Sequence, residues 1–377
     1  MTLHDLPTPA LLLDERRMAR NLARLDRHLR ALGVPLRPHL KTAKCVEVAR
    51  RMMPTPEGPA TVSTLREAEQ FAAAGVRDLL YAVGIAPHKL ERVVALRRTG
   101  VDLAIVLDSL EQADAVVTAC RAHRERIPTL VEIDADDRRA GLKPDDPTLV
   151  AIGRRLVDGG AELRGVMTHA GGSYDHAGAD AIIAAAEGER AAVAEAARAL
   201  RDAGLACPVV SVGSTPTAHF ARDLPGVTEV RAGVYVFQDL VMAGIGVCAI
   251  DDIAIGVLAS VIGHRRDKGW ILVDAGWTAL SRDRGTASQA LDQGYGVVCD
   301  AHGRPLEDLI VVATNQEHGI VALRDGSRAT LPELPVGTLV RILPNHACAT
   351  AAQFDGYHVV ADDAGSVSAW WPRFSGW

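Results

Sequence analysis

The sequence has no apolar run that approaches the roughly 20 residues needed to cross a bilayer, so we expect no membrane-spanning helix. It also lacks a basic stretch followed by an apolar core near Met1, which predicts a cytoplasmic protein without a secretory signal. The net charge is −6, so there is no basic excess for binding nucleic acid or an anionic membrane. We therefore expect small molecules and other copies of the chain as partners.

The cysteines are few and scattered, without a CxxC pair or the density of a disulfide scaffold. The six are Cys45, Cys120, Cys207, Cys248, Cys299 and Cys348. Most are expected to be buried thiols in a reducing compartment. Cys348 is the exception, because its neighbours suggest chemistry.

At 377 residues the chain exceeds the roughly 250–300 residues over which one hydrophobic core usually grows, so two domains are expected. Short apolar runs alternate with helical patterns, including an Ala-rich stretch at 179–203. The predicted strands are 35–39, 60–64, 79–83, 102–107, 129–133, 164–168, 208–212 and 227–231. Strands joined through helices run parallel, and eight such units predict a (β/α)8 barrel of the TIM type. An open sheet is the alternative, because periodicity does not show closure.

Beyond about residue 245 the sequence becomes rich in short β segments with no long helix between them. These segments are 255–262, 270–274, 309–314, 337–343 and 357–360. They predict an antiparallel β domain, either a sandwich or a barrel, to which residues 9–14 add a strand. We therefore assign residues 15–240 to the barrel, and residues 1–14 plus 241–377 to the β domain.

Lys41 lies within the segment Arg37–Lys44, just past the first predicted strand. Most lysines are solvated surface residues, but barrel active sites gather where strands end. Partial desolvation of an amine there lowers its pKa and frees its lone pair, which favours Schiff-base formation. Lys41 is therefore the candidate catalytic residue.

Two glycine-containing turns follow the last two predicted barrel strands. Their residues are Gly213, Ser214 and Thr215 in one turn, and Arg231, Gly233, Val234 and Tyr235 in the other. Such turns are often only structural, but this part of a barrel commonly binds phosphate through backbone N–H groups and hydroxyls. A phosphorylated ligand beside a reactive lysine is what pyridoxal 5′-phosphate (PLP) requires.

His346 and Cys348 stand two residues apart, after a predicted strand. On extended backbone both side chains point to the same face and can reach one ion. Imidazole plus thiolate favours Zn²⁺, and two protein ligands leave positions open for water and substrate. The alternative is a buried cysteine beside a histidine in a turn.

Further polar side chains follow strands or interrupt apolar segments. Arg139, His169 and Tyr174 follow the fifth and sixth strands, where a guanidinium can hold the phenolate oxygen of PLP and a ring can stack on it. Gln316 and His318 form a polar cluster in the β domain, as possible substrate contacts.

The chain resembles the fold-type III PLP enzymes of the D-serine dehydratase and D-threonine aldolase group, which are distantly similar to alanine racemase. The resemblance covers nearly the whole length. Its segments are Thr8–Ala10, Arg37–Lys44, Val62–Thr64, Glu67–Glu69, Glu132–Gly141, Thr168–Tyr174, Ser211–Thr217, Arg231–Phe237, Val273–Gly276 and Pro344–Cys348. Within the group, the segments Val210–Thr217 and Ile342–Cys348 are most similar to the 3-hydroxyaspartate dehydratases.

The resemblance implies that Lys41 carries PLP and that His346 and Cys348 hold zinc, with other divalent ions as alternatives. It implies that Arg139 lies near the PLP phenolate. The residues implied to hold the phosphate are Ser214, Thr215, Gly233 and Val234. Arg231 takes the place from which alanine racemases address the pyridine nitrogen, although this group varies there. A homodimer is implied as well.

The activity implied is that of a carbon–oxygen lyase that dehydrates D-configured β-hydroxy amino acids, with D-threo-3-hydroxyaspartate as the expected substrate. The second carboxylate of that substrate needs a cation, for which Arg282 and Arg284 are candidates. Two alternatives within the group stay open: a D-serine dehydratase, and a metal-activated aldolase for D-threonine or 3-hydroxy-D-aspartate. Aldolases usually place aspartate where Cys348 stands, which favours dehydration. A non-catalytic PLP carrier protein, which would lack the β domain, is the alternative from another class.

Overall fold

The computed structural model of the chain describes residues 1–361 and 365–377. It divides into two compact units. The barrel unit comprises residues 25–233 and 376–377, and the β unit comprises residues 1–24 and 234–375. Each is described separately below.

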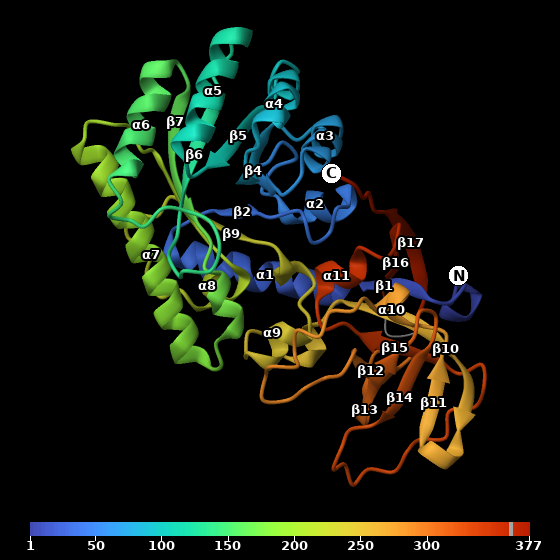
Figure 1. Cartoon of the computed structure of the whole chain (residues 1–377). Coiled ribbons are helices and arrows are strands. Elements are labelled where there is room, and N and C mark those ends of the chain that lie inside the picture. Colours follow the sequence, from blue (N-terminus) through green and yellow to red (C-terminus); the bar gives the residue numbers. More distant parts are fainter. Residues whose placement is uncertain (362–364) are drawn as a thin grey trace. The chain divides into compact units, whose positions relative to one another are not determined.

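The barrel unit contains the eight predicted parallel strands, with bounds shifted by at most a few residues (Figure 1). They are β2 (Leu36–Pro38), β3 (Ala60–Val62), β4 (Asp78–Gly84), β5 (Asp102–Leu107), β6 (Pro128–Ile133), β7 (Glu162–Thr168), β8 (Val209–Val212) and β9 (Glu229–Ala232). They pair in the order β2-β9-β8-β7-β6-β5-β4-β3. A parallel bridge between His39 and Thr61, just past β2, joins the two ends. The sheet is therefore closed, and the barrel prediction is confirmed.

Helices connect these strands and lie outside them, as Figure 1 shows for α5, α6 and α7 beside β5–β7. They are α1 (Glu15–Leu32), which begins in the β unit, α2 (Val46–Met52), α3 (Leu65–Ala73), α4 (Leu90–Arg97), α5 (Leu110–His123), α6 (Thr148–Gly159), α7 (Ala179–Asp202) and α8 (Thr215–Phe220). Alanine has the best helix propensity, and the Ala-rich stretch forms the long helix α7 as predicted. The interior of the unit includes a cluster of Leu80, Val106, Leu130 and Met167, contributed by β4 to β7.

The β unit is built on one mixed sheet, whose described strands number nine. They are β1 (Ala10–Asp14), β10 (Ile255–Arg265), β11 (Trp270–Val273), β12 (Val297–Asp300), β13 (Pro305–Thr314), β14 (Gly319–Leu323), β15 (Leu339–Leu343), β16 (Gly356–Val360) and β17 (Val367–Pro372). The order β11-β14-β13-β12-β15-β10, with β10 also paired to β11, closes an antiparallel barrel. β1 joins β10 on one side and β16 on the other, so the predicted N-terminal strand is confirmed.

Three strands, β12, β14 and β17, were not among the predicted segments. Each is four to six residues long, and each is stabilised by pairing with a strand that the pattern did predict, as β14 is by β13. Short helices complete the unit: α9 (Leu240–Gly244), α10 (Trp277–Leu280) and α11 (Ala347–Ala351).

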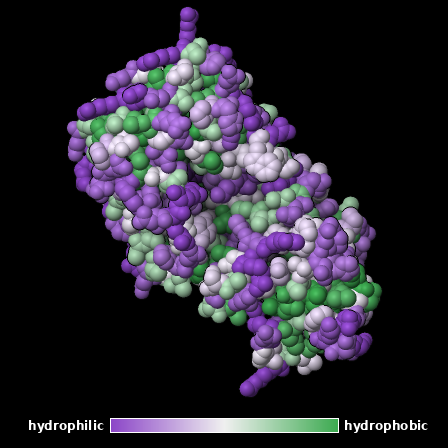
Figure 2. Space-filling model, viewed as in Figure 1, coloured by the Kyte–Doolittle hydropathy of each residue, from purple (hydrophilic) through white to green (hydrophobic). Residues whose placement is uncertain are grey.

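The face of the molecule seen in Figure 2 is largely polar. Figure 2 shows charged and polar residues over much of the visible face, interrupted by apolar patches.

Within residues 1–361 and 365–377, no helix combines the length and hydropathy needed to cross a membrane. In the same residues all six cysteines are free thiols; four are buried, while Cys248 and Cys348 are partly exposed. The expectation of mostly buried thiols is confirmed.

Candidate active site

Lys41 lies on a turn that is held from both sides at the end of β2. The His39 N–H donates to the Ala232 carbonyl at 2.8 Å, and the Leu40 N–H donates to the Thr61 carbonyl at 2.8 Å. Three residues later, Lys44 has φ of 45° and its Nζ lies 3.2 Å from Oε1 of buried Glu67. The backbone on both sides of Lys41 is therefore fixed, while its own side chain is exposed.

Two half-buried histidines, His39 and His169, lie in the electrostatic field of Lys41. Burial lowers the pKa of His39 well below its usual value, and the charges of Lys41 and Arg231 lower it further. Burial lowers the pKa of His169 to about 3, with Arg139, Lys41 and Arg231 acting in the same direction. Both rings are therefore neutral near pH 7, and this end of the barrel is electropositive. An anionic group such as a phosphate suits such a site.

We expect His169 to make stability depend on pH. Because the pKa of His169 drops from 6.5 to about 3 on folding, the unfolded chain binds more protons between these values. The contribution of neutral His169 to the free energy of unfolding is full above about pH 6.5 and is lost as the pH falls toward 3. Between pH 7 and 5 the loss amounts to about 1 kcal/mol after allowance for solvent screening of the half-buried ring.

Urea unfolding of the wild type and of His169→Gln, without cofactor and at pH 7 and pH 5, measures the contribution of His169 to the free energy of unfolding. Glutamine keeps a donor but does not titrate, so its unfolding free energy should fall less from pH 7 to 5. Equal pH dependence in the two proteins would contradict the assignment.

The turn after β8 is bonded to the loop after β7. The Gly213 carbonyl lies 2.8 Å from His169 Nδ1, and because a carbonyl only accepts, Nδ1 carries the proton and Nε2 is left as an acceptor. Ser214 begins α8, where its Oγ contacts Ser173 Oγ at 2.8 Å and Thr217 Oγ1 at 2.9 Å. Thr215 is fully buried. The hydroxyl of Ser214 is thus used to shape the turn.

Arg231 and Gly233 lie at the end of β9. Arg231 is buried, and its two terminal nitrogens donate to Ser211 Oγ and to the Thr168 carbonyl. A Cβ on Gly233 would lie 3.1 Å from the His39 carbonyl oxygen, so a larger residue would press on the turn that carries Lys41. Val234 and Tyr235 follow in η4 (Val234–Val236), already within the β unit, and are buried.

Arg139 and Tyr174 lie in the loops after β6 and β7. Arg139 is exposed, with Nη2 3.5 Å from Oε1 of Glu132. Tyr174 lies in η3 (Gly171–Asp175), its ring centroid 6.2 Å from that of His169. Since β2 and β6 to β9 run parallel in one closed barrel, their C-terminal ends bring the predicted cofactor residues of the barrel unit to one end of it.

His346 and Cys348 meet in the β unit, but not on extended backbone as predicted. His346 is the extended residue before α11, and Cys348 lies within that helix. The two side chains still interact directly. The error has a physical reason: the Asp239 carboxylate, distant in sequence, accepts from the Ala347 N–H at 2.9 Å and starts a helix where the pattern suggested a strand.

Asp283 orients the His346 ring, a role that the sequence analysis did not predict. Its Oδ2 lies 2.8 Å from His346 Nδ1, leaving Nε2 for a ligand. Burial would lower the pKa of His346, but Asp283 and Cys348 raise it to about 11. A divalent ion bound here takes the place of a proton, so its affinity decreases with falling pH. A carboxylate on the second nitrogen is the usual partner of a metal-binding histidine.

The residues of the two candidate sites fit the two groups that the resemblance implies, PLP and a divalent metal ion. An exposed amine in an electropositive site suits PLP, and an imidazole oriented by a carboxylate beside a thiol suits a soft divalent ion. In the described part of the chain, no group of three or more His, Cys, Asp or Glu side chains is arranged to hold a metal. Two protein ligands fit a site whose other positions are open.

Arg282 and Arg284 flank Asp283 but differ in what they contact. The Arg284 guanidinium donates to Asp292 Oδ2 at 2.6 Å and stacks 4.9 Å from the centroid of Tyr295. Arg282 is exposed and stacks 4.3 Å from the centroid of Trp277, and it forms no ion pair with any residue the structure describes. Its charge is therefore available to a ligand.

Gln316 and His318 are exposed in the turn between β13 and β14. This turn is attached to α10, since the Trp277 N–H donates to the Asn315 carbonyl at 3.0 Å. It therefore lies beside the residue on which Arg282 stacks. The structure does not show either side chain contacting His346 or Cys348.

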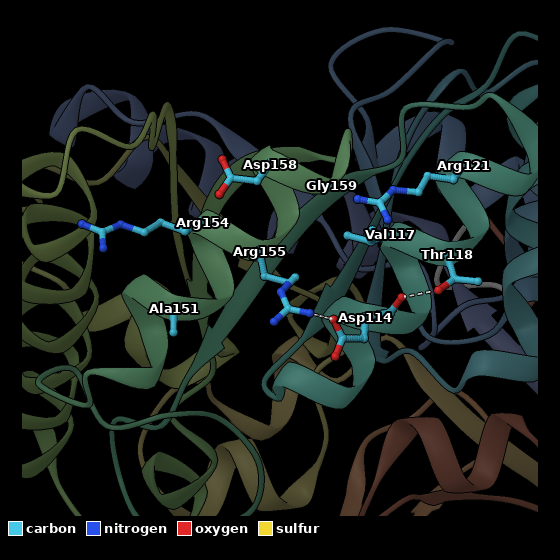
Figure 3. Close-up of a pocket in the computed structure, with 9 residues that line it drawn as sticks. All are labelled: Asp114, Val117, Thr118, Arg121, Ala151, Arg154, Arg155, Asp158 and Gly159. Carbon is cyan, nitrogen blue, oxygen red and sulfur yellow. Dashed lines mark hydrogen bonds and ion pairs between the residues drawn. The ribbon is translucent and has the colours of Figure 1, made fainter.

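A surface groove of about 570 Å³ lies elsewhere, on the outside of the barrel between α5 and α6 (Figure 3). Arginines and aspartates both line it, and Arg155 pairs with Asp114. None of the predicted site residues lines this groove. We do not assign it to the active site.

Comparison with known proteins accounts for both units. A family model described as "Alanine racemase, N-terminal domain" matches residues 13–240, and one described as "Putative serine dehydratase domain" matches residues 254–360. The chain is 55% identical over 379 residues to D-threo-3-hydroxyaspartate dehydratase of Delftia sp. (strain HT23), covering 100% of this chain and 99% of that protein. It is 28% identical to D-serine dehydratase of Dictyostelium discoideum, covering 98% of each.

The solved structure of the Delftia dehydratase has a TM-score of 0.96 at 54% identity, with 100% of both chains covered. A mutant of a D-threo-3-hydroxyaspartate dehydratase, 54% identical to this chain, has also been solved in a metal-free form. A closed parallel barrel with a lysine after its first strand, followed by a β domain, defines an alanine racemase-like enzyme of PLP fold type III. The chain belongs, within that fold, to the family of D-serine dehydratase and D-threo-3-hydroxyaspartate dehydratase. The resemblance predicted from the sequence is confirmed, and the carrier-protein alternative is wrong.

Proposed function

We propose that this protein is a PLP- and zinc-dependent dehydratase that converts D-threo-3-hydroxyaspartate to oxaloacetate and ammonia. The observation that carries the proposal is the 55% identity to the Delftia enzyme over 100% of this chain and 99% of that protein. We further propose a cytoplasmic homodimer. Residues 15–240 form its PLP-binding domain, and residues 1–14 plus 241–377 form the domain that carries the metal ligands.

Lys41 is the residue that holds PLP and moves the proton. Bound PLP supplies an electron sink for the electron pair left at the substrate Cα. The Lys41 amine would hold PLP, and when not bonded to it Nζ would be the base for the Cα proton. The electropositive end of the barrel binds the phosphate, with the turns at Gly213–Thr215 and Gly233–Val234 supplying backbone contacts. The neutral His169 ring would pack against the bound cofactor, and the Arg139 guanidinium would bind its phenolate oxygen.

His346 and Cys348 hold the metal ion, for which zinc fits an imidazole and thiolate pair better than magnesium does. A bound divalent ion supplies Lewis acidity that makes a β-hydroxyl a better leaving group. Asp283 fixes the His346 ring so that Nε2 is the ligand atom.

Arg282 should determine the preference for a substrate with a second carboxylate. It is the cation left available in this loop, and Trp277 holds its guanidinium by stacking. We expect Arg282→Met to lower kcat/KM for D-threo-3-hydroxyaspartate about 10- to 100-fold, the value of a charge-assisted hydrogen bond, with kcat/KM for D-serine changed by no more than about three-fold.

Arg284→Met is the matched control. Since Asp292 already neutralises Arg284, its loss should lower activity on both substrates equally, through the local structure. Equal effects of the Arg282 substitution on both substrates would show that Arg282 does not bind the second carboxylate.

Retro-aldol cleavage is the second candidate activity, since the group includes aldolases. Incubation with D-threonine separates the two reactions. Elimination yields 2-oxobutanoate and ammonia, whereas cleavage between Cα and Cβ yields glycine and acetaldehyde. Cys348, in place of the usual aspartate of the aldolases, favours elimination.

A further inference from the structure

Glu189 is an unusual residue for its position. It lies in the middle of α7, whose other buried side chains are apolar, including Ile182, Ala186 and Val193. Its side chain is 2% exposed. A buried carboxylate is costly unless its oxygens are bonded, so what it contacts shows why it is tolerated there.

The Glu189 carboxylate joins the ends of two neighbouring strands. Its Oε1 accepts from the Ala170 N–H at 3.0 Å, in the loop after β7, and from the Gly213 N–H at 2.9 Å, in the turn after β8. The Thr217 side chain, in the first turns of α8, bonds to it as well. One oxygen therefore fixes the distance between two loops.

These two loops carry residues of the proposed cofactor site. His169 directly precedes Ala170, and its Nδ1 donates to the Gly213 carbonyl, so Gly213 is held at its N–H by Glu189 and at its carbonyl by His169. Ser214 follows Gly213 and bonds to Thr217. A shift of the Glu189 carboxylate would thus move the His169 ring and the phosphate-binding turn together.

We propose that Glu189 is a positioning residue of the cofactor site: through Ala170 and Gly213 it holds the His169 ring and the Gly213–Thr215 turn in the arrangement that binds PLP. It does not itself touch the cofactor. This inference rests on the proposed function, because it takes these loops to be the PLP-binding loops.

Two variants distinguish the length of the side chain at position 189 from its negative charge. Glu189→Asp keeps the charge but withdraws the oxygen by one methylene, which breaks both backbone contacts. Glu189→Gln keeps an oxygen at the same reach and turns its amide toward Thr217, whose hydroxyl can accept. Glu195→Asp, an exposed position on the same helix, is the matched control.

The measurement is the dissociation constant of PLP for the full-length protein after removal of its cofactor, by fluorescence titration well below the unfolding temperature. We expect Glu189→Asp to weaken PLP binding about 10-fold or more, Glu189→Gln to stay within about three-fold of the wild type, and the control to be unchanged. Rescue by glutamine distinguishes positioning from a general loss of stability.

Two results would overturn the proposal: a Glu189→Asp protein that binds PLP as the wild type does, or a Glu189→Gln protein as weak as Glu189→Asp. The second result would mean that an oxygen at the right reach is not sufficient, so that Glu189 does not act by positioning alone. A wild-type protein that does not bind PLP at all would instead refute the proposed function, so the two failures are distinguishable.

Discussion

Replacing Lys41 by alanine should lower kcat about 10³-fold or more and remove the absorption band of the lysine-bound cofactor, roughly at 410–420 nm. The turn that carries Lys41 is bonded on both sides, to Ala232 and to Thr61, so the change removes the amine without releasing the loop. Absorption spectra of the purified protein and a keto-acid assay together measure both effects.

Lys143→Ala is the control for a general effect of removing a lysine from the barrel unit. Lys143 pairs with Asp134 and Asp137 and is half-exposed, and its loss should leave the spectrum and the rate unchanged. If the absorption band persisted in Lys41→Ala, another residue would hold the cofactor.

Replacing Cys348 by alanine should remove the metal ion and lower elimination about 10²- to 10³-fold, since Lewis-acid assistance contributes several kcal/mol to such a reaction. His346 and Asp283 stay in place, but a single imidazole is too few ligands to hold a divalent ion tightly. Metal content after dialysis, measured by mass spectrometry, and the elimination rate should fall together.

Cys120→Ala, a buried thiol on α5 of the barrel unit, is the matched control and should retain both metal and rate. PLP binding to Cys348→Ala should also be retained, because Lys41 is unchanged. Full metal content in Cys348→Ala would exclude the thiol as a ligand.

The barrel was predictable because its signal is local. Each strand is a short apolar run bounded by helical periodicity, and parallel pairing follows from the length of the crossovers. Closure was not predictable, since it depends on the bridge between His39 and Thr61, and periodicity does not show which strands pair. The short strands β12 and β14 were missed for a similar reason, because they form against partners rather than by propensity.

In the candidate site, the sequence singles out residues whose type concentrates chemistry, as at Lys41, His346 and Cys348. The residues that hold these side chains in place could not be predicted from the sequence. Asp283 reaches His346 from 63 positions away, and Glu189 reaches Gly213 from the middle of an Ala-rich helix. Such contacts are set by tertiary packing. The same holds for Asp239, whose bond to the Ala347 N–H converts the predicted extended segment at Cys348 into helix.

The most direct test of the account is product analysis with D-threo-3-hydroxyaspartate before and after removal of the metal ion by a chelator. The account predicts oxaloacetate and ammonia in equal amounts, loss of turnover on chelation, and recovery when zinc is added back. Turnover that is unaffected by complete metal removal, or formation of glycine and glyoxylate in place of oxaloacetate, would contradict it.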